Sequence, residues 1–157
     1  MIAEAEIENA IAAAFTAQLS AQSAPTPRIV KSWEALADGE VKGQADASAA
    51  TIAIAAGIRQ YDSFCSPQAD IPCSVAISVR RDADPTAATF AAVIEPILDL
   101  CHIWNQDVDE AADDLSTASF DIGGFRLSSG SRQITQDAFS LSLDFTLRGV
   151  IKTPTNN

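Results

Sequence analysis

Positive charge is scarce in this sequence of 157 residues. Its 10 lysines and arginines stand against 21 aspartates and glutamates, which gives a formal net charge of −11. Proteins that bind nucleic acid through its phosphates need a cluster of basic side chains, and the pair Arg80-Arg81 is too small to provide one. We therefore expect no specific binding of DNA or RNA. The same charge disfavours an anionic membrane surface.

Long apolar runs are also absent. No stretch reaches the roughly 18 residues that would indicate a membrane-spanning helix. The first segment carries Glu4, Glu6 and Glu8 and no lysine or arginine, whereas a secretory signal begins with positive charge and a mitochondrial presequence contains arginine. We expect the protein to remain in the cytoplasm where it is made.

Cysteine and histidine are few, and no known catalytic motif contains them. The three cysteines, Cys65, Cys73 and Cys101, form no CxxC pair, so neither zinc binding nor redox chemistry is indicated. An odd number without an export signal favours free thiols, although a disulfide between Cys65 and Cys73 is sterically conceivable. The single histidine, His102, falls late in a predicted helix, and GxSxG and HExxH are both missing. We expect no catalysis and no cofactor.

The densest polar feature is the acidic stretch 107–114. Asp107 and Asp109 alternate as calcium ligands do, but a calcium loop also needs a third oxygen ligand, a glycine and a terminal glutamate. Ala111 and Ala112 occupy the third-ligand and glycine positions. We therefore expect a solvated acidic loop or short helical turn and no metal site.

Aromatic residues make up only 6% of the chain, and alanine supplies much of its 47% apolar content. Alanine favours helix but buries little surface. The length fits one domain, and we expect a modest core anchored by the few large side chains. These include Phe90, Trp104, Phe120 and Phe145.

Apolar spacing predicts two amphipathic helices. The first covers Ala3–Gln22, with Glu4 and Glu8 on its polar face, and it ends before two prolines that force extended backbone. The second covers Thr86–Asn105 and contains Pro96, which is expected to kink it.

Alternating apolar residues predict four strands. They cover Thr51–Gln60, Ser74–Arg81, Ser119–Leu127 and Ala138–Ile151. The first two form an antiparallel hairpin with a long tip, Tyr61–Pro72. The phase of the third strand slips at Gly123-Gly124, which is typical of a bulge. The fourth is the longest and is expected to be the spine of the sheet.

The element order α-β-β-α-β-β predicts an α+β fold in a single domain, residues 1–157. Because each strand buries one face, we expect one mostly antiparallel sheet with both helices on the same side. Residues 23–48 are predicted to form an irregular connection, and residues 153–157 a loose tail.

The long hairpin tip carries the candidate partner-interface residues, Tyr61, Phe64 and Pro67. Apolar side chains in a long loop between two strands are candidates for burial against a partner. The alternative is that they fold back on their own sheet.

In architecture the chain resembles the tail-terminator and head–tail joining (minor tail) proteins of long-tailed phages and prophages, which cap the tail tube. The resemblance covers nearly the whole chain and rests on the order and length of its elements. These are the helix Ala3–Gln22, the hairpin Thr51–Arg81, the helix Thr86–Asn105 and two closing strands that end in SLSLDFTLRGVI.

The resemblance implies a structural virion protein, not an enzyme, that forms a six-fold ring with copies of itself. It also implies tail-tube and head-connector proteins as partners, assembly in the host cytoplasm, and a final place in the tail or neck of the virion. The hairpin tip would contact a neighbour or the tube. A net charge of −11 would suit a passage for DNA, since negative walls do not retain phosphates.

Two other functions stay open on the sequence alone. A small-molecule or peptide-binding module without catalysis would use the uncovered face of the sheet. It would need a concave, aromatic-lined pocket, which the scarcity of aromatics disfavours. An enzyme with a dispersed site would be built on residues such as His102 and Asp107.

Overall fold

A computed structural model describes residues 2–34, 50–63 and 66–152. Within them one sheet has the strand order β1-β2-β4-β6-β5, with the short β3 paired to β4. The strands are β1 (Arg28–Lys31), β2 (Ala50–Ala56), β3 (Gln60–Tyr61), β4 (Gln68–Arg80), β5 (Phe120–Ile134) and β6 (Ala138–Ile151). All pairings are antiparallel except that of β1 with β2. The predicted α+β class and mostly antiparallel sheet are confirmed.

The centre of the sheet is the pair β4 and β6, whose residues alternate between apolar and polar. Buried pairs such as Val75 with Leu143 lie on one face. The neighbouring pair of Ala76 with Ser142 is exposed on the other face. The sheet therefore has one apolar face that needs a cover and one polar face that does not.

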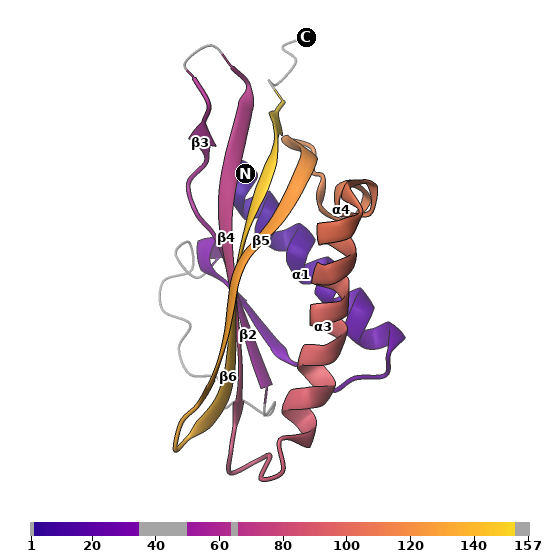
Figure 1. The fold of residues 1–157 in the computed structure, drawn as a ribbon, viewed down its shortest axis with the longest axis vertical. Helices are drawn as coiled ribbons and strands as arrows, with labels where there is room; N and C mark the ends of the chain where they lie inside the picture. Colours follow the sequence, from indigo (N-terminus) through magenta and orange to yellow (C-terminus); the bar gives the residue numbers. More distant parts are fainter. Residues whose placement is uncertain (1, 35–49, 64–65, 153–157) are drawn as a thin grey trace.

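Three helices cover the apolar face. They are α1 (Ala3–Ala21), α3 (Ala88–Gln106) and α4 (Val108–Leu115). Figure 1 shows α1, α3 and α4 on the same side of the sheet. The stripe that α1 buries includes Ile7, Ile11 and Phe15, at the helical spacing that the sequence predicts. No described helix is both long enough and apolar enough to cross a membrane.

Aromatic rings form a continuous row through the core. Phe15 stacks on Trp104 with ring centroids 6.1 Å apart, Trp104 meets Phe125 edge-on at 5.6 Å, and Phe125 lies 5.0 Å from Phe145. The four predicted anchors, Phe90, Trp104, Phe120 and Phe145, are all buried. Their predicted role as large residues in the core is confirmed, although many Ile, Leu and Val side chains share that core.

Several predicted boundaries are corrected by the structure. β5 continues to Ile134 rather than ending at Leu127, because its second half pairs with β6, and β2 ends at Ala56 rather than Gln60. β4 begins at Gln68 rather than Ser74, because the segment expected to be loop pairs with the end of β6. The connection after α1 contains β1, whose backbone pairs with β2. The acidic stretch forms the helix α4, which Asp107 caps by accepting a hydrogen bond from Asp109 N at 3.0 Å.

The start of α3 is fixed by a buried carboxylate. Asp84 accepts hydrogen bonds from the backbone N–H groups of Thr89 (3.0 Å) and Phe90 (2.9 Å), and it is 4% exposed. Ala87 adopts a left-handed conformation with φ of 59°, so the helix begins two residues later than its proline signal predicts. Pro96 lies inside α3, as predicted.

The glycines near the end of the sheet have different roles. The register of β5 against β6 shifts between Ile122 and Gly124, which confirms the predicted bulge. Gly149, near the end of β6, packs so closely that an added Cβ would lie 2.0 Å from the carbonyl oxygen of Asp121. Only glycine fits there.

Two glutamates of α1 are buried, although the sequence places them on the polar face of that helix. Glu4 and Glu8 are each 1% exposed. Glu8 accepts hydrogen bonds from the backbone N–H groups of Trp33 (2.9 Å) and Ala56 (2.8 Å). The polar face of α1 therefore meets backbone donors just after β1 and at the end of β2, which periodicity alone does not reveal.

Several predictions fall outside the described residues. These concern Phe64, Cys65, residues 35–48 of the connection and the tail 153–157.

Candidate functional site at the hairpin corner

The predicted interface residues lie at one corner of the sheet, which we call the hairpin corner: residues 60–63, 66–70 and 148–151. Tyr61 belongs to β3 and is 52% exposed. Pro67 precedes β4 and is also exposed, while its carbonyl accepts a hydrogen bond from Ile151 N at 2.9 Å. Phe64 lies outside the described residues. The exposure of Tyr61 favours a partner interface over packing on its own sheet.

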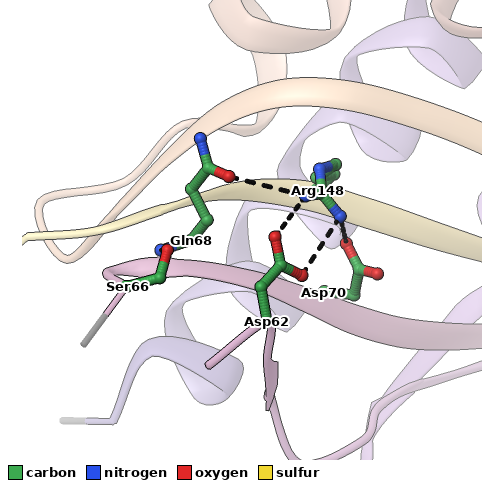
Figure 2. A network of polar contacts seen from close by, with 5 residues as sticks. All are labelled: Asp62, Ser66, Gln68, Asp70 and Arg148. Carbon is green, nitrogen blue, oxygen red and sulfur yellow. Dashed lines mark hydrogen bonds and ion pairs between the residues drawn. The ribbon is translucent and has the colours of Figure 1, made fainter. Parts of the chain in front are cut away.

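A single arginine of β6 binds β4 and the residue that follows β3 at this corner. Figure 2 shows the guanidinium of Arg148, from β6, between the carboxylates of Asp62 and Asp70. Its Nη1 donates to Asp70 Oδ1 at 3.2 Å and its Nη2 donates to Asp62. Gln68 Oε1 completes the group at 3.5 Å from Nη2. The hairpin is thereby attached to β6 by side chains as well as by its backbone.

The group of Asp62, Asp70 and Arg148 carries more negative than positive charge. Two carboxylates, Asp62 and Asp70, share the one guanidinium of Arg148. The hydrogen bond to Asp62, and then the charges of Asp62 and Asp70, raise the pKa of Arg148 above its ordinary value. Because all three side chains are exposed to solvent by about a third or more, the group orients the hairpin rather than adding much stability.

The backbone of β3 offers an unused edge. Asp62 N donates to Gln68 O at 3.2 Å, so Tyr61 and its partner Ala69 form a non-hydrogen-bonded pair. The N–H and C=O of Tyr61 therefore point away from β4. No described residue makes a hydrogen bond to them.

The preceding outward N–H of this edge is capped. Arg59 N donates to Glu4 Oε1 at 3.0 Å, and the Arg59 guanidinium donates to both oxygens of Glu4 at 2.7 and 2.8 Å. The pairing surface of β3 therefore starts at Tyr61. In this way α1 limits the open edge to the hairpin corner.

A shallow hollow of about 220 Å³ lies beside Arg148. Its lining residues are Asp70, Gly124, Phe125, Arg126, Thr146 and Arg148. Two arginines, a carboxylate and a threonine hydroxyl line it together with the backbone around Gly124. Guanidinium groups in such a lining can hold a carboxylate or another small anion.

The other chemically interesting residues lie elsewhere. Burial raises the pKa of the Cys101 thiol to about 12, and burial followed by the charge of Glu8 raises the pKa of Cys73. Both thiols therefore stay protonated and unreactive near neutral pH. His102 follows Cys101 in the sequence, but it is exposed whereas the thiol is buried. Asp107 is engaged in capping α4.

Sequence reasoning located Tyr61 and Pro67 but missed Arg148, Asp62 and Asp70. The alternation of the last strand places Arg148 on its polar face, and the register of β4 and β6 sets Asp70 opposite it. The predicted strand begins at Ser74, after Asp70, so the sequence analysis does not bring these two residues together. Neither a protein-family model nor a curated protein sequence matches this chain.

Proposed function

We propose that this protein is a structural subunit of a phage tail that forms a ring with copies of itself at the end of the tail tube. The order helix, hairpin, helix and closing hairpin supports the proposal, since the resemblance to tail-terminator proteins rests on it. Its partners would be the tail-tube and head-connector proteins. The net charge of −11 suits a ring through which DNA passes.

The observation that carries the proposal is the hairpin corner, which is exposed and yet held in place. Tyr61 is half-exposed at a position fixed by the Arg148 group. Tyrosine is enriched in interfaces, and a surface that is ordered before binding loses less entropy on association. An interaction surface explains this arrangement, whereas catalysis does not require it.

The proposal is tested by the mass and shape of the isolated protein. We expect size exclusion with light scattering to show a mass near six times the 16.5 kDa of one chain, and negative-stain images of that peak to show rings. Tyr61→Asp should shift the protein towards monomer. The matched control is Ile103→Asp, which places the same charge at a 43% exposed apolar site on α3 and should leave the mass unchanged.

The result that would contradict the proposal is a monomer at every concentration in both wild type and variants. Equal loss of assembly in Tyr61→Asp and Ile103→Asp would show that any added charge disrupts the oligomer. In that case the hairpin corner would not be the contact.

The alternative, a small-molecule or peptide-binding module without catalysis, stays a prediction. The observation in its favour is the hollow beside Arg148, where Arg126 makes no ion pair with a described residue. Amide chemical shifts of Arg126 and Thr146 during titration with a small carboxylate such as benzoate would test it. Unchanged shifts would remove this alternative.

A further inference from the structure

Strand β5 is an edge strand whose first half is capped by the helices. Ile122 N donates to Ser116 Oγ at 3.0 Å, and Leu127 N donates to Asn105 Oδ1, from α3, at 3.2 Å. Both N–H groups point away from β6 and would otherwise be free to pair with another strand. The helix layer thus closes this edge as far as Leu127.

The second half of β5, which we call the distal edge (residues 129–134), has no such cap. Thr135 N donates to Ala138 O at 2.9 Å and closes the β5–β6 turn. Hydrogen-bonded and non-hydrogen-bonded residue pairs alternate along an antiparallel ladder. Counting back from Thr135, the non-hydrogen-bonded positions of β5 are Gly130, Arg132 and Ile134. The N–H and C=O of these three residues point outward, and no described residue bonds to them.

The distal edge carries exposed apolar side chains and one basic residue, Arg132, while Asp144, opposite its first residue, accepts a hydrogen bond from Ser129 Oγ at 3.0 Å. Ile134 is 60% exposed and Leu127 is 37% exposed. Leu98, on α3, is also exposed and lies seven residues before Asn105, so it shares the face of that helix that meets β5. Arg132 makes no ion pair with any described residue. An incoming strand would find outward backbone groups, apolar side chains and a positive charge.

The hairpin corner can meet the open backbone groups and the Arg132 charge of the distal edge. Tyr61 presents an outward N–H and C=O, and the carboxylates of Asp62 and Asp70 exceed the charge of Arg148 by one. Exposed apolar side chains also gather near it. These are Ile58, Tyr61 and Val150.

Other edges of the same chain fit less well. Strand β1 has a basic residue at each end, Arg28 and Lys31, of which Lys31 is paired with Glu34 at 2.9 Å, so it brings no excess negative charge towards Arg132. Pairing of two distal edges about a two-fold axis centred on Arg132 would set two arginines opposite each other, which destabilises a strand pair. It would also end at a dimer.

We propose that the distal edge of β5 in one copy receives the β3 segment of the next copy, so that the sheet continues from subunit to subunit. This inference rests on the proposed ring function and names its two contact surfaces. They lie at opposite ends of β6, because β3 pairs next to Gly149 through β4 whereas the distal edge pairs with residues 139–144. Figure 1 shows β3 at the top of the molecule and the β5–β6 turn at the bottom.

Because the two surfaces differ, the contact is head-to-tail. Such a contact repeats around the assembly and closes into a ring when the rotation between neighbours allows it. No second type of contact is needed.

The proposal is tested by two variants that each damage one surface. Ile134→Lys places a charge on the distal edge, as natural proteins do to protect an edge, and Tyr61→Asp damages the β3 side. Each variant alone should be monomeric. Their equimolar mixture should form dimers of about 33 kDa, twice the 16.5 kDa chain, because one intact distal edge remains opposite one intact β3.

A pair of variants at Arg132 tests the backbone hydrogen bond separately, because both remove the same side-chain charge and only one removes the N–H. Arg132→Pro removes an outward N–H without removing a hydrogen bond to β6, so it should weaken assembly by roughly tenfold or more. Arg132→Ala, which keeps the N–H, is its control and should weaken assembly less. Circular dichroism would show that each variant is folded.

The outcomes separate the inference from the function on which it rests. If wild type is monomeric at every concentration, the ring function fails. If wild type assembles and both Ile134→Lys and Arg132→Pro assemble equally well, the distal edge is not the contact and the inference alone is overturned. If the mixture of variants stays monomeric, the two surfaces do not face each other. Assembly lost in Ile134→Lys but kept in Tyr61→Asp would overturn β3 as the occupant.

Discussion

Carboxylates meet arginines and backbone donors in two regions of this molecule, with opposite consequences. At α1, Glu4 and Glu8 are buried and bind the end of β2 and the segments beside it. At the hairpin corner, Asp62 and Asp70 bind Arg148 in contact with solvent. The same chemistry serves stability where water is excluded and orientation where water is present. Variants in the two regions should therefore separate folding from assembly.

The largest expected effect is at Glu8. Replacing it with alanine leaves the buried N–H of Ala56 and the part-buried N–H of Trp33 without their acceptor, which should lower the free energy of unfolding by about 3 kcal/mol. Urea denaturation measures this change. Glu34→Ala, at a side chain 60% exposed, is the control and should change stability by no more than about 0.5 kcal/mol. Equal effects would refute a structural role for Glu8.

Next in size is a change at the glycine of the hairpin corner. Gly149→Ala would force a Cβ against Asp121 O and against Phe120 Cζ, at 2.0 and 2.8 Å, and should destabilise the fold by about 2–3 kcal/mol. Gly124→Ala is the matched variant on the neighbouring strand. Its Cβ would meet Arg148 Cβ at 3.4 Å, so a much smaller loss is expected. Thermal unfolding of the two variants is the measurement. A larger loss in Gly149→Ala indicates the close contact with Asp121, whereas equal losses would show that any added side chain destabilises this corner.

The pH dependence of stability should reveal Glu4. Burial alone would raise the pKa of its carboxyl, but hydrogen bonds from the Arg59 side chain and from the backbone outweigh burial and hold the pKa below the ordinary 4.5. A lowered pKa adds stability that is present above the unfolded-state value and is lost as the pH falls through the folded-state value. Wild type should therefore lose stability below about pH 4.5.

The control for this prediction is Glu4→Gln, which cannot titrate. Its unfolding free energy should be lower than that of wild type at neutral pH, and the difference should shrink in acid. A difference that stays constant down to about pH 3 would contradict the assignment.

The smallest effect on stability is expected at Arg148, together with a large effect on assembly. Arg148→Gln breaks an exposed group, so the urea midpoint should hardly move. The hairpin would lose its attachment to β6, and association should weaken by roughly tenfold. Arg80→Gln, at another exposed ion pair, should alter neither property. A large loss of stability in Arg148→Gln would show that the corner is structural.

Much of the fold follows from the sequence because the periodicity of α1, α3, β4 and β6 reports directly which face is buried. The bulge at Gly123-Gly124 was visible for the same reason, as a slip in phase. β1 and β3 were not visible, because strands of four and two residues are too short to show alternation. Their positions depend on pairing with β2 and β4.

The candidate site could be predicted only in part. Tyr61 stood out because an apolar ring lay between two strands in a polar loop. The group around Arg148 depends on the register of β4 against β6, which sets Asp70 opposite Arg148, and register is a long-range property. The burial of Glu4 and Glu8 could not be predicted, because periodicity shows the side of a helix on which a residue lies, but not what covers that side.

The central claim is that this chain assembles with copies of itself through an exposed, oriented corner. Sedimentation velocity of the wild-type protein over a wide concentration range tests it most directly. A single large species near six subunits, which Tyr61→Asp converts to monomer, is the result we predict. A species at the mass of one chain, 16.5 kDa, at every concentration would contradict the claim.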